Sequence, residues 1–170
     1  MTGIMQTLLN NNVLTPAVVY NPGLVRTRYN GYFNDDVNWF STASIANTSI
    51  NTSPLTPGYS GDLYSIQWLG YFRPSTTETY TLYTDSDDAS YLWIGSTAVS
   101  GFTTSNALVQ NGGQHGMQER SGSIALTAGV YYNIRIQFGE NLGGDDCIIR
   151  YSTPSIAKTT NMTNLIWYQP

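Results

Sequence analysis

Acidic side chains are scarce in this sequence, but they gather in two short segments, 84–90 and 139–146. Six of the eleven acidic residues lie there: Asp85, Asp87, Asp88, Glu140, Asp145 and Asp146. Neighbouring carboxylates repel each other by about 1 kcal/mol at 4 Å in water, and a divalent cation between them reverses the sign of that energy. Carboxylate, amide and carbonyl oxygens are the ligands that Ca²⁺ prefers. The two segments therefore form a candidate calcium site, to which Asn141 and the 142–144 backbone could add oxygens.

Spacing alone leaves other interpretations open. The same carboxylates could belong to two solvated acidic turns without a metal. An EF-hand is excluded, because the sixth position counted from Asp85 is Ser90 rather than glycine and the twelfth is Ser96 rather than glutamate. Paired carboxylates could also serve as the acid and base of a glycosidase, but nothing in the sequence singles out a proton donor.

Short runs of alternating or aromatic-rich residues must position these segments. Turn residues separate the runs, and helix signals are weak, with at most a turn or two at 5–9. The predicted strands are 24–33, 63–72, 78–84, 91–95, 122–127, 130–138, 147–152 and 164–168. This pattern indicates an all-β fold, an antiparallel β-sandwich with very little helix. The acidic segments follow strands 78–84 and 130–138, so they meet at one end of the sandwich if those two strands run in the same direction.

The length of 170 residues fits one domain. We expect residues 1–20 to be an N-terminal leader or linker and residues 21–170 to form a single β-sandwich domain. The segment 41–61, rich in Ser, Thr, Asn and Pro, is expected to be a long surface excursion. Trp68 and Trp93 lie in strand patterns and are expected in the core, whereas His115 is expected to be an exposed residue of a glycine-rich loop.

Composition excludes several classes of protein. Charged residues make up 11% of the chain and the net charge is −4, which argues against a nucleic-acid partner. No apolar stretch approaches 18 residues, so membrane insertion is not expected. Cys147 is the single cysteine, which excludes an internal disulfide, and its apolar strand predicts a buried, inert thiol. The N-terminal segment lacks the basic and apolar regions of a secretory signal.

Several motifs, in this order along the chain, resemble the domain named after anthrax protective antigen. They are Gly31-Tyr32-Phe33, YSIQWLGY at 64–71, TYTLY at 79–83, DDASYLWIG at 87–95, SIALTAG at 123–129 and YYNIRIQF at 131–138. The resemblance spans about residues 23–153 and implies a β-sandwich module. The WIG ending at 93–95 and the stretch 105–107 are most similar to the branch that contains yeast flocculins and GLEYA-type adhesins.

The resemblance implies a calcium site that also binds sugar. In that branch a pair of aspartates joined by a cis peptide binds Ca²⁺, the same ion coordinates sugar hydroxyls, and a second loop adds an asparagine and backbone carbonyls. The implied metal ligands are Asp87, Asp88, Asn141, Gly143 and Asp145. The residues expected to contact the sugar are Asp87, Asp88, Glu140, Asn141, Asp145 and Asp146. The branch normally carries N-terminal cysteines and a secretory signal, which this sequence lacks.

We therefore expect a calcium-dependent carbohydrate-binding, lectin-like domain that is not an enzyme and recognises glycans on a cell or host surface. A single site of this kind binds weakly, so useful avidity needs several copies in a larger assembly. The expected location is extracellular or cell-surface exposed, or alternatively a virion surface. The alternative function is a structural or capsid-associated surface domain without sugar binding.

Overall fold

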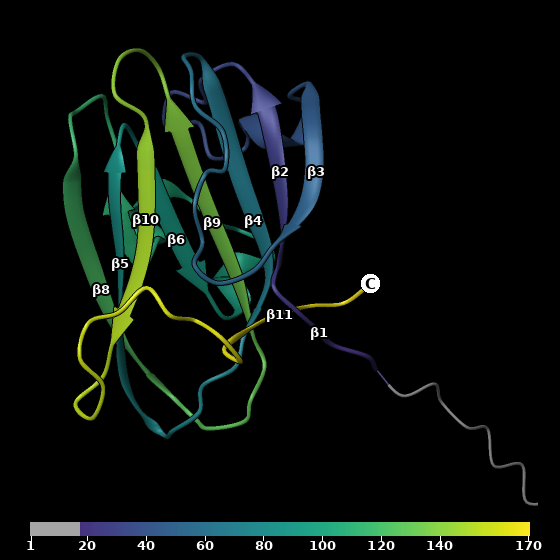
Figure 1. Cartoon of the computed structure of the whole chain (residues 1–170), viewed down its shortest axis with the longest axis vertical. Coiled ribbons are helices and arrows are strands. Elements are labelled where there is room, and N and C mark those ends of the chain that lie inside the picture. Colours follow the sequence, from purple (N-terminus) through teal and green to yellow (C-terminus); the bar gives the residue numbers. More distant parts are fainter. Residues whose placement is uncertain (1–17) are drawn as a thin grey trace, which may run out of the picture.

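Two antiparallel β-sheets face each other in the computed structural model, which describes residues 18–170 (Figure 1). The larger sheet contains β1 (Asn21–Pro22), β2 (Leu24–Asn30), β3 (Ile45–Asn51), β4 (Tyr64–Phe72), β6 (Ser90–Ile94), β7 (Val109–Asn111), β9 (Tyr132–Glu140) and β11 (Ile166–Tyr168). The smaller sheet contains β5 (Glu78–Asp87), β8 (Gln118–Leu126) and β10 (Asp146–Ser152), with β5 in the middle. Helical structure among the described residues is limited to three short turns, Trp39–Ser41, Ser96–Ala98 and Thr104–Asn106. The predicted sandwich with very little helix is confirmed.

The main core lies between the two sheets and follows from the alternation in β5 and β9. In β5, Tyr80 and Leu82 are fully buried while their neighbours Thr81 and Tyr83 are only partly covered. Trp68 of β4 is also fully buried, as predicted. A period of two places successive side chains on opposite faces, so the inward residues of both sheets pack together.

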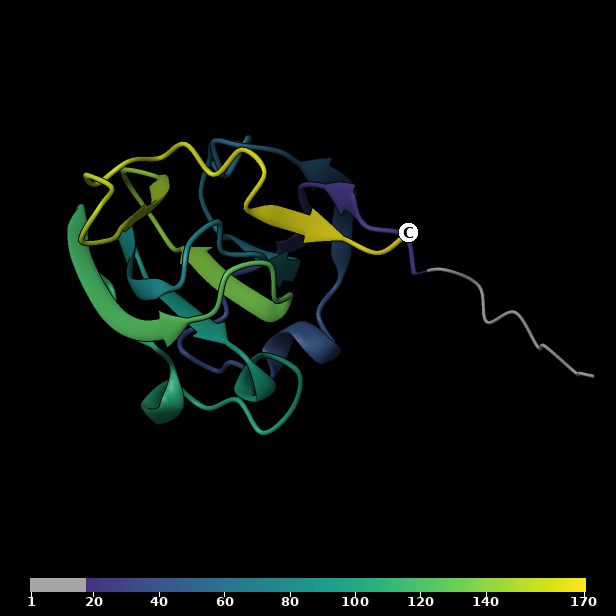
Figure 2. The same ribbon diagram turned by 90° about the horizontal axis from the view of Figure 1, so that it is seen from below.

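A second, smaller core covers the outer face of the large sheet. Phe33 and Phe40, from the segment after β2, pack there with Tyr91 and Trp93 of β6. The three short helical turns gather on this outer side of the molecule (Figure 2). Because loops cover this face, strands β4 and β6 are buried on both sides, which explains their nearly continuous apolar sequences.

Strand direction brings the acidic segments together. Strands β5 and β9 lie in different sheets but point the same way (Figure 1), and they end at Asp87 and Glu140. In the antiparallel register, Tyr64 at the start of β4 pairs with Glu140, and Asp146 at the start of β10 pairs with Asp87. The loops before β4 and before β10 therefore flank the ends of β5 and β9, and we call this region the acidic end.

Some expectations are wrong in detail. The segment 41–61 is not entirely a surface excursion, because it contains β3, which pairs with β2. Nearly every residue of β3 is exposed, so the strand has none of the alternation that would have marked it. The short strand β7 was also missed. The turn of helix expected at 5–9 lies outside the described residues, as does most of the expected leader, although Tyr20 stacks on Tyr131 with ring centroids 3.7 Å apart.

Among residues 18–170, no helix has the length and apolar character needed to cross a membrane.

Candidate metal and ligand site

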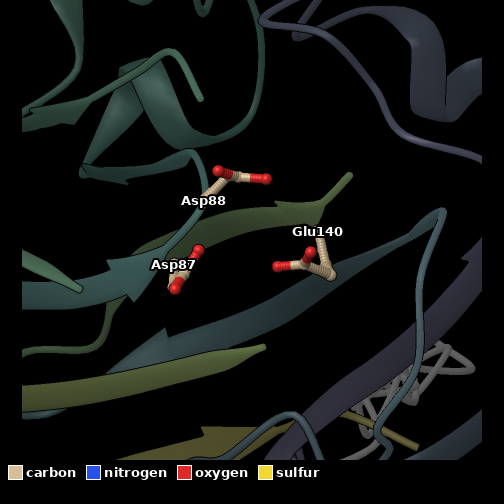
Figure 3. Close-up of side chains that lie close together, drawn as sticks. All are labelled: Asp87, Asp88 and Glu140. Atoms are coloured by element: carbon tan, nitrogen blue, oxygen red, sulfur yellow. The ribbon is translucent and has the colours of Figure 1, made fainter. Parts of the chain in front are cut away.

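Three carboxylates converge at the acidic end (Figure 3). Asp87 ends β5, Asp88 follows it through a cis peptide bond, and Glu140 ends β9. One carboxylate oxygen from each residue lies within 4.8 Å of those of the other two. The small sheet thus contributes the aspartate pair and the large sheet contributes the glutamate, so the cluster bridges the two layers of the sandwich.

The carboxylate of Glu140 is buried without a partner. The residue is 0% exposed, and neither of its carboxylate oxygens has a hydrogen-bond partner within the described part of the chain. Burial, followed by repulsion from Asp88 and Asp87, raises the pKa of Glu140 to about 8. Burial and the charge of Asp88 also raise the pKa of Asp87. An unpaired buried carboxylate is costly, whereas a bound cation would stabilise it.

Backbone amides hold Asp88 in place. Its Oδ1 accepts a hydrogen bond from the His115 amide at 2.8 Å, and its Oδ2 accepts one from the Asn141 amide at 3.0 Å. Asp88 is only 5% exposed. Hydrogen bonds to both oxygens fix the orientation of this carboxylate.

Two loops beside the cluster, 59–63 and 141–145, are joined by reciprocal bonds. Asp62 Oδ1 accepts a hydrogen bond from the Gly143 amide at 3.1 Å, and Asp145 Oδ2 accepts one from the Gly61 amide at 2.8 Å. Between them, the Leu63 amide donates to the Asn141 carbonyl at 2.9 Å. We call these three bonds the loop latch. Each loop supplies both donors and acceptors to these bonds, so the two loops are held together. The joined loops form one wall of the acidic end.

The loop between β7 and β8 forms another wall. The carboxylate of Asp35 accepts hydrogen bonds from the Gly113 amide at 3.0 and 3.2 Å and from the Tyr91 hydroxyl at 3.1 Å. This loop carries His115, whose Nε2 is buried without a hydrogen-bond partner among residues 18–170. The Tyr32 hydroxyl is likewise buried and unpartnered there. Burial, followed by the charges of Asp35, Asp88 and Glu140, raises the pKa of this hydroxyl. His115 lies in the glycine-rich loop as expected, but it is only partly exposed rather than fully exposed.

The residues expected at the site have different surroundings. Asp87, Asp88 and Glu140 come together, so Glu140 joins the carboxylates that could hold a metal ion. Asn141 and Gly143 bond the neighbouring loops through their backbones, and the Asp145 carboxylate is engaged in the loop latch. Asp146 is exposed, and its Oδ1 accepts a hydrogen bond from the next amide, that of Cys147.

Asp85, which lies in the first acidic segment, takes no part in the cluster. Its carboxylate forms a salt bridge with Arg150 at 3.0 Å. Sequence reasoning missed Asp62 and Asp35, which position the surrounding loops. Asp62 had a recognisable signal, because it directly precedes a predicted strand that is antiparallel to the one ending at Glu140. Asp35 had none, since its contacts with Gly113 span 78 residues of sequence.

The donor set fits a hard divalent cation. All three converging groups are carboxylates, and the two unpartnered oxygens of Glu140 are available to a ligand. Ca²⁺ takes 6–8 oxygen ligands and often combines carboxylates with amide or backbone carbonyl oxygens. Cys147 is excluded as a soft ligand, because it is fully buried in the main core.

Comparison with known proteins gives the family. The curated protein Anti-sigma-I factor RsgI3 of Acetivibrio thermocellus is 29% identical over 97 residues, which is 57% of this chain but only 14% of that relative. A solved anti-sigma factor domain-containing protein matches with a TM-score of 0.70 and 21% identity, over 88% of this chain and 49% of that one. The A domain of Epithelial Adhesin 6 from Candida glabrata, solved with Galb1-3GlcNAc, matches with a TM-score of 0.68 and 16% identity, over 90% and 89% of the two chains. The model of the GLEYA domain matches residues 64–151, more than half of the sequence, so the chain belongs to the GLEYA domain family.

Proposed function

We propose that this domain is a calcium-dependent carbohydrate-binding module that recognises surface glycans. The observation that carries the proposal is the buried, unpartnered Glu140 carboxylate beside the Asp87–Asp88 pair. Membership of the GLEYA family supports it, as does the fold shared with an adhesin domain solved in complex with a galactose-containing disaccharide.

The three converging carboxylates would hold the ion. Asn141, through its side-chain amide, and Gly143 and Asp145, through their carbonyls, are proposed as further ligands. Bound Ca²⁺ supplies coordination positions that sugar hydroxyls can occupy. The chain itself orients Asp88 through two backbone amides, and the carboxylate oxygens of the site accept hydrogen bonds from the same hydroxyls.

We place the sugar at the outer rim of the acidic end. There Asp87, Glu140, Asn141, Asp145 and the exposed Asp146 are the proposed sugar contacts, together with Asp88. Each hydrogen bond contributes about 0.5–1.5 kcal/mol net, or about 1.5–3 kcal/mol when one partner is charged. A single site of this kind binds weakly, so we propose that copies act together on a cell or host surface.

The proposed role is recognition outside the cell rather than catalysis. The alternative is a structural domain without sugar binding, at a virion surface or inside a larger protein. The match to the anti-sigma factor favours a part in a larger protein, because the aligned region is a small share of that relative.

Calorimetric titration with Ca²⁺ tests the metal site. We expect one calcium ion to bind the wild-type domain and the variant Asp87→Asn/Asp88→Asn to lose that binding. Asp36→Asn is the matched control, because Asp36 is an exposed aspartate whose Oδ1 accepts a hydrogen bond from the Asn38 amide, outside the cluster. Absence of calcium uptake by the wild type would remove the proposal.

A glycan array, probed with and without chelator, tests the ligand. Binding that disappears with chelator and with the double variant supports the lectin function. Calcium uptake without any glycan signal would favour the structural alternative.

A further inference from the structure

Leu63 has an unusual combination of exposure and backbone conformation. Its side chain is 53% exposed, and its φ of 54° is in the left-handed region. A left-handed conformation is uncommon for a bulky residue, and glycine or asparagine adopts it at a lower cost. An exposed leucine also gains little from burial. Neither the backbone nor the core therefore accounts for leucine at this position.

The surrounding contacts fix Leu63 at the rim of the site. Its amide donates to the Asn141 carbonyl, the preceding Asp62 binds the Gly143 amide, and the Gly61 amide donates to Asp145. The residue is thus held inside the loop latch, immediately beside the segment that follows Glu140. A strained residue persists where its surroundings over-determine it, and such residues cluster at functional sites.

A second exposed leucine lies across the latch. Leu142 is 64% exposed and sits between Asn141 and Gly143, the two residues that bond the Leu63 loop. Two exposed apolar side chains thus lie on the joined loops of a region that is otherwise rich in carboxylates. We call Leu63 and Leu142 the apolar rim.

The charges at this end disfavour an acidic ligand. The salt bridges among residues 18–170 join Arg150 and Lys158 to Asp85 and Glu119, and none involves the cluster or the loop latch. The five carboxylates of Asp62, Asp87, Asp88, Glu140 and Asp145 therefore form no salt bridge among the described residues. One divalent ion does not neutralise them all, so a sialylated, sulfated or uronic sugar is repelled.

From these observations we propose that Leu63, together with Leu142, is a specificity-determining ligand contact that packs against the apolar face of an uncharged sugar. This inference rests on the proposed carbohydrate-binding function. The hydroxyls of the sugar face the calcium cluster, while its C–H face or a methyl substituent covers the apolar rim. The cost of leucine in the left-handed conformation is then offset by the ligand rather than by the fold.

The variant Leu63→Asn separates ligand contact from structure. Asparagine tolerates the left-handed conformation, so we expect the midpoint of thermal unfolding to stay unchanged or rise. Calcium affinity measured by calorimetry should remain within twofold of the wild type. Affinity for the neutral glycans bound on the array should fall about fivefold, which corresponds to the loss of about 40 Å² of apolar contact.

Leu142→Ser is the second variant and should behave in the same way toward glycans. Val130→Ser is the matched control, because Val130 is 43% exposed in the loop just before β9, whose other end reaches Glu140. Its glycan affinity should equal that of the wild type.

Each other outcome overturns a defined part of the reasoning. Unchanged glycan affinity in Leu63→Asn and Leu142→Ser, with wild-type binding intact and chelator-sensitive, overturns the apolar rim alone. A lower unfolding midpoint in Leu63→Asn, or a parallel loss of calcium affinity, shows that the residue serves the fold or the metal loop and also overturns it. Tighter binding of sialylated or sulfated glycans than of their neutral counterparts overturns the charge argument. Absence of any glycan binding by the wild type overturns the proposed function and the rim together.

Discussion

The metal-free domain should lose stability as the pH rises from about 5 to 8, and Glu140→Gln should abolish most of that loss. Burial raises the pKa of Glu140 to about 8 from an ordinary value of 4.5. Between these two values the folded state binds more protons than the unfolded state, so the free energy of unfolding decreases with pH. The protonated Glu140 therefore stabilises the folded state fully at pH values below the pKa of the unfolded state. This stabilisation is lost as the pH rises through the pKa of the folded state.

The magnitude follows from the size of the shift. A difference of about 3.5 pKa units corresponds to at most about 5 kcal/mol at about 1.36 kcal/mol per unit. Glu140 itself is buried, but neighbouring residues such as Leu142 and Asp146 are exposed, so nearby water screens its charge and we expect about 2 to 3 kcal/mol between pH 5 and pH 8. Asp87, whose pKa is also raised, adds a smaller loss in the same direction.

Urea unfolding at pH 5, 6.5 and 8, with calcium removed by a chelator, measures this slope in the wild type and in Glu140→Gln. Saturating Ca²⁺ should restore stability to the wild type at pH 8, because the ion binds the ionised carboxylate of the folded state. It should restore less in the variant, which lacks that charge. A flat pH profile in the metal-free wild type, or an equal slope in Glu140→Gln, would refute the assignment of a buried, uncompensated carboxylate.

Three further predictions concern the metal, the thiol and the core. Asp87→Asn should weaken calcium binding at least tenfold by calorimetry. Asp146→Asn should change it less than threefold, because Asp146 is exposed and its carboxylate accepts a hydrogen bond from the amide of Cys147. Equal losses in the two variants would contradict the assigned cluster. Cys147 is 0% exposed and burial raises its pKa, so Ellman's reagent should label it only as fast as the domain unfolds, and rapid labelling in the native state would contradict its burial. Trp68→Ala should lower the free energy of unfolding by about 3–5 kcal/mol in urea titrations, because Trp68 is fully buried between the sheets; a loss below 1 kcal/mol would contradict that position.

Two central strands could be predicted because apolar and polar residues alternate along their sequences. Segments 78–84 and 130–138 alternate clearly, and they correspond to β5 and β9, which carry the site. Strand β3 could not be predicted, because it is an edge strand exposed along nearly its whole length. Within residues 18–170 its only partner is β2, and that pairing lies in the tertiary structure rather than in the local sequence.

The site was predictable where it depends on strand ends and not where it depends on long-range loop contacts. Asp87, Asp88 and Glu140 each lie at or just after the end of a recognisable strand, so parallel orientation of β5 and β9 was enough to bring them together. The sequence did not show that Asp145 would be engaged by Gly61, 84 residues away. Contacts of this kind depend on which loops the finished sheets bring to one end.

The position of the cluster across the two sheets has a mechanical consequence. Strands β1 and β11 pair beside Tyr71 and Phe72, at the opposite end of β4 from the start that faces Glu140 (Figure 1). A force applied between a ligand at the acidic end and the chain at β1 or β11 is therefore directed along the strands. Such a force shears neighbouring strands past each other, so many hydrogen bonds between the strands bear the load at the same time. An ion held by Asp87 of the small sheet and Glu140 of the large sheet would couple the two layers at the loaded end. Tension would then be shared between the sheets instead of peeling one from the other.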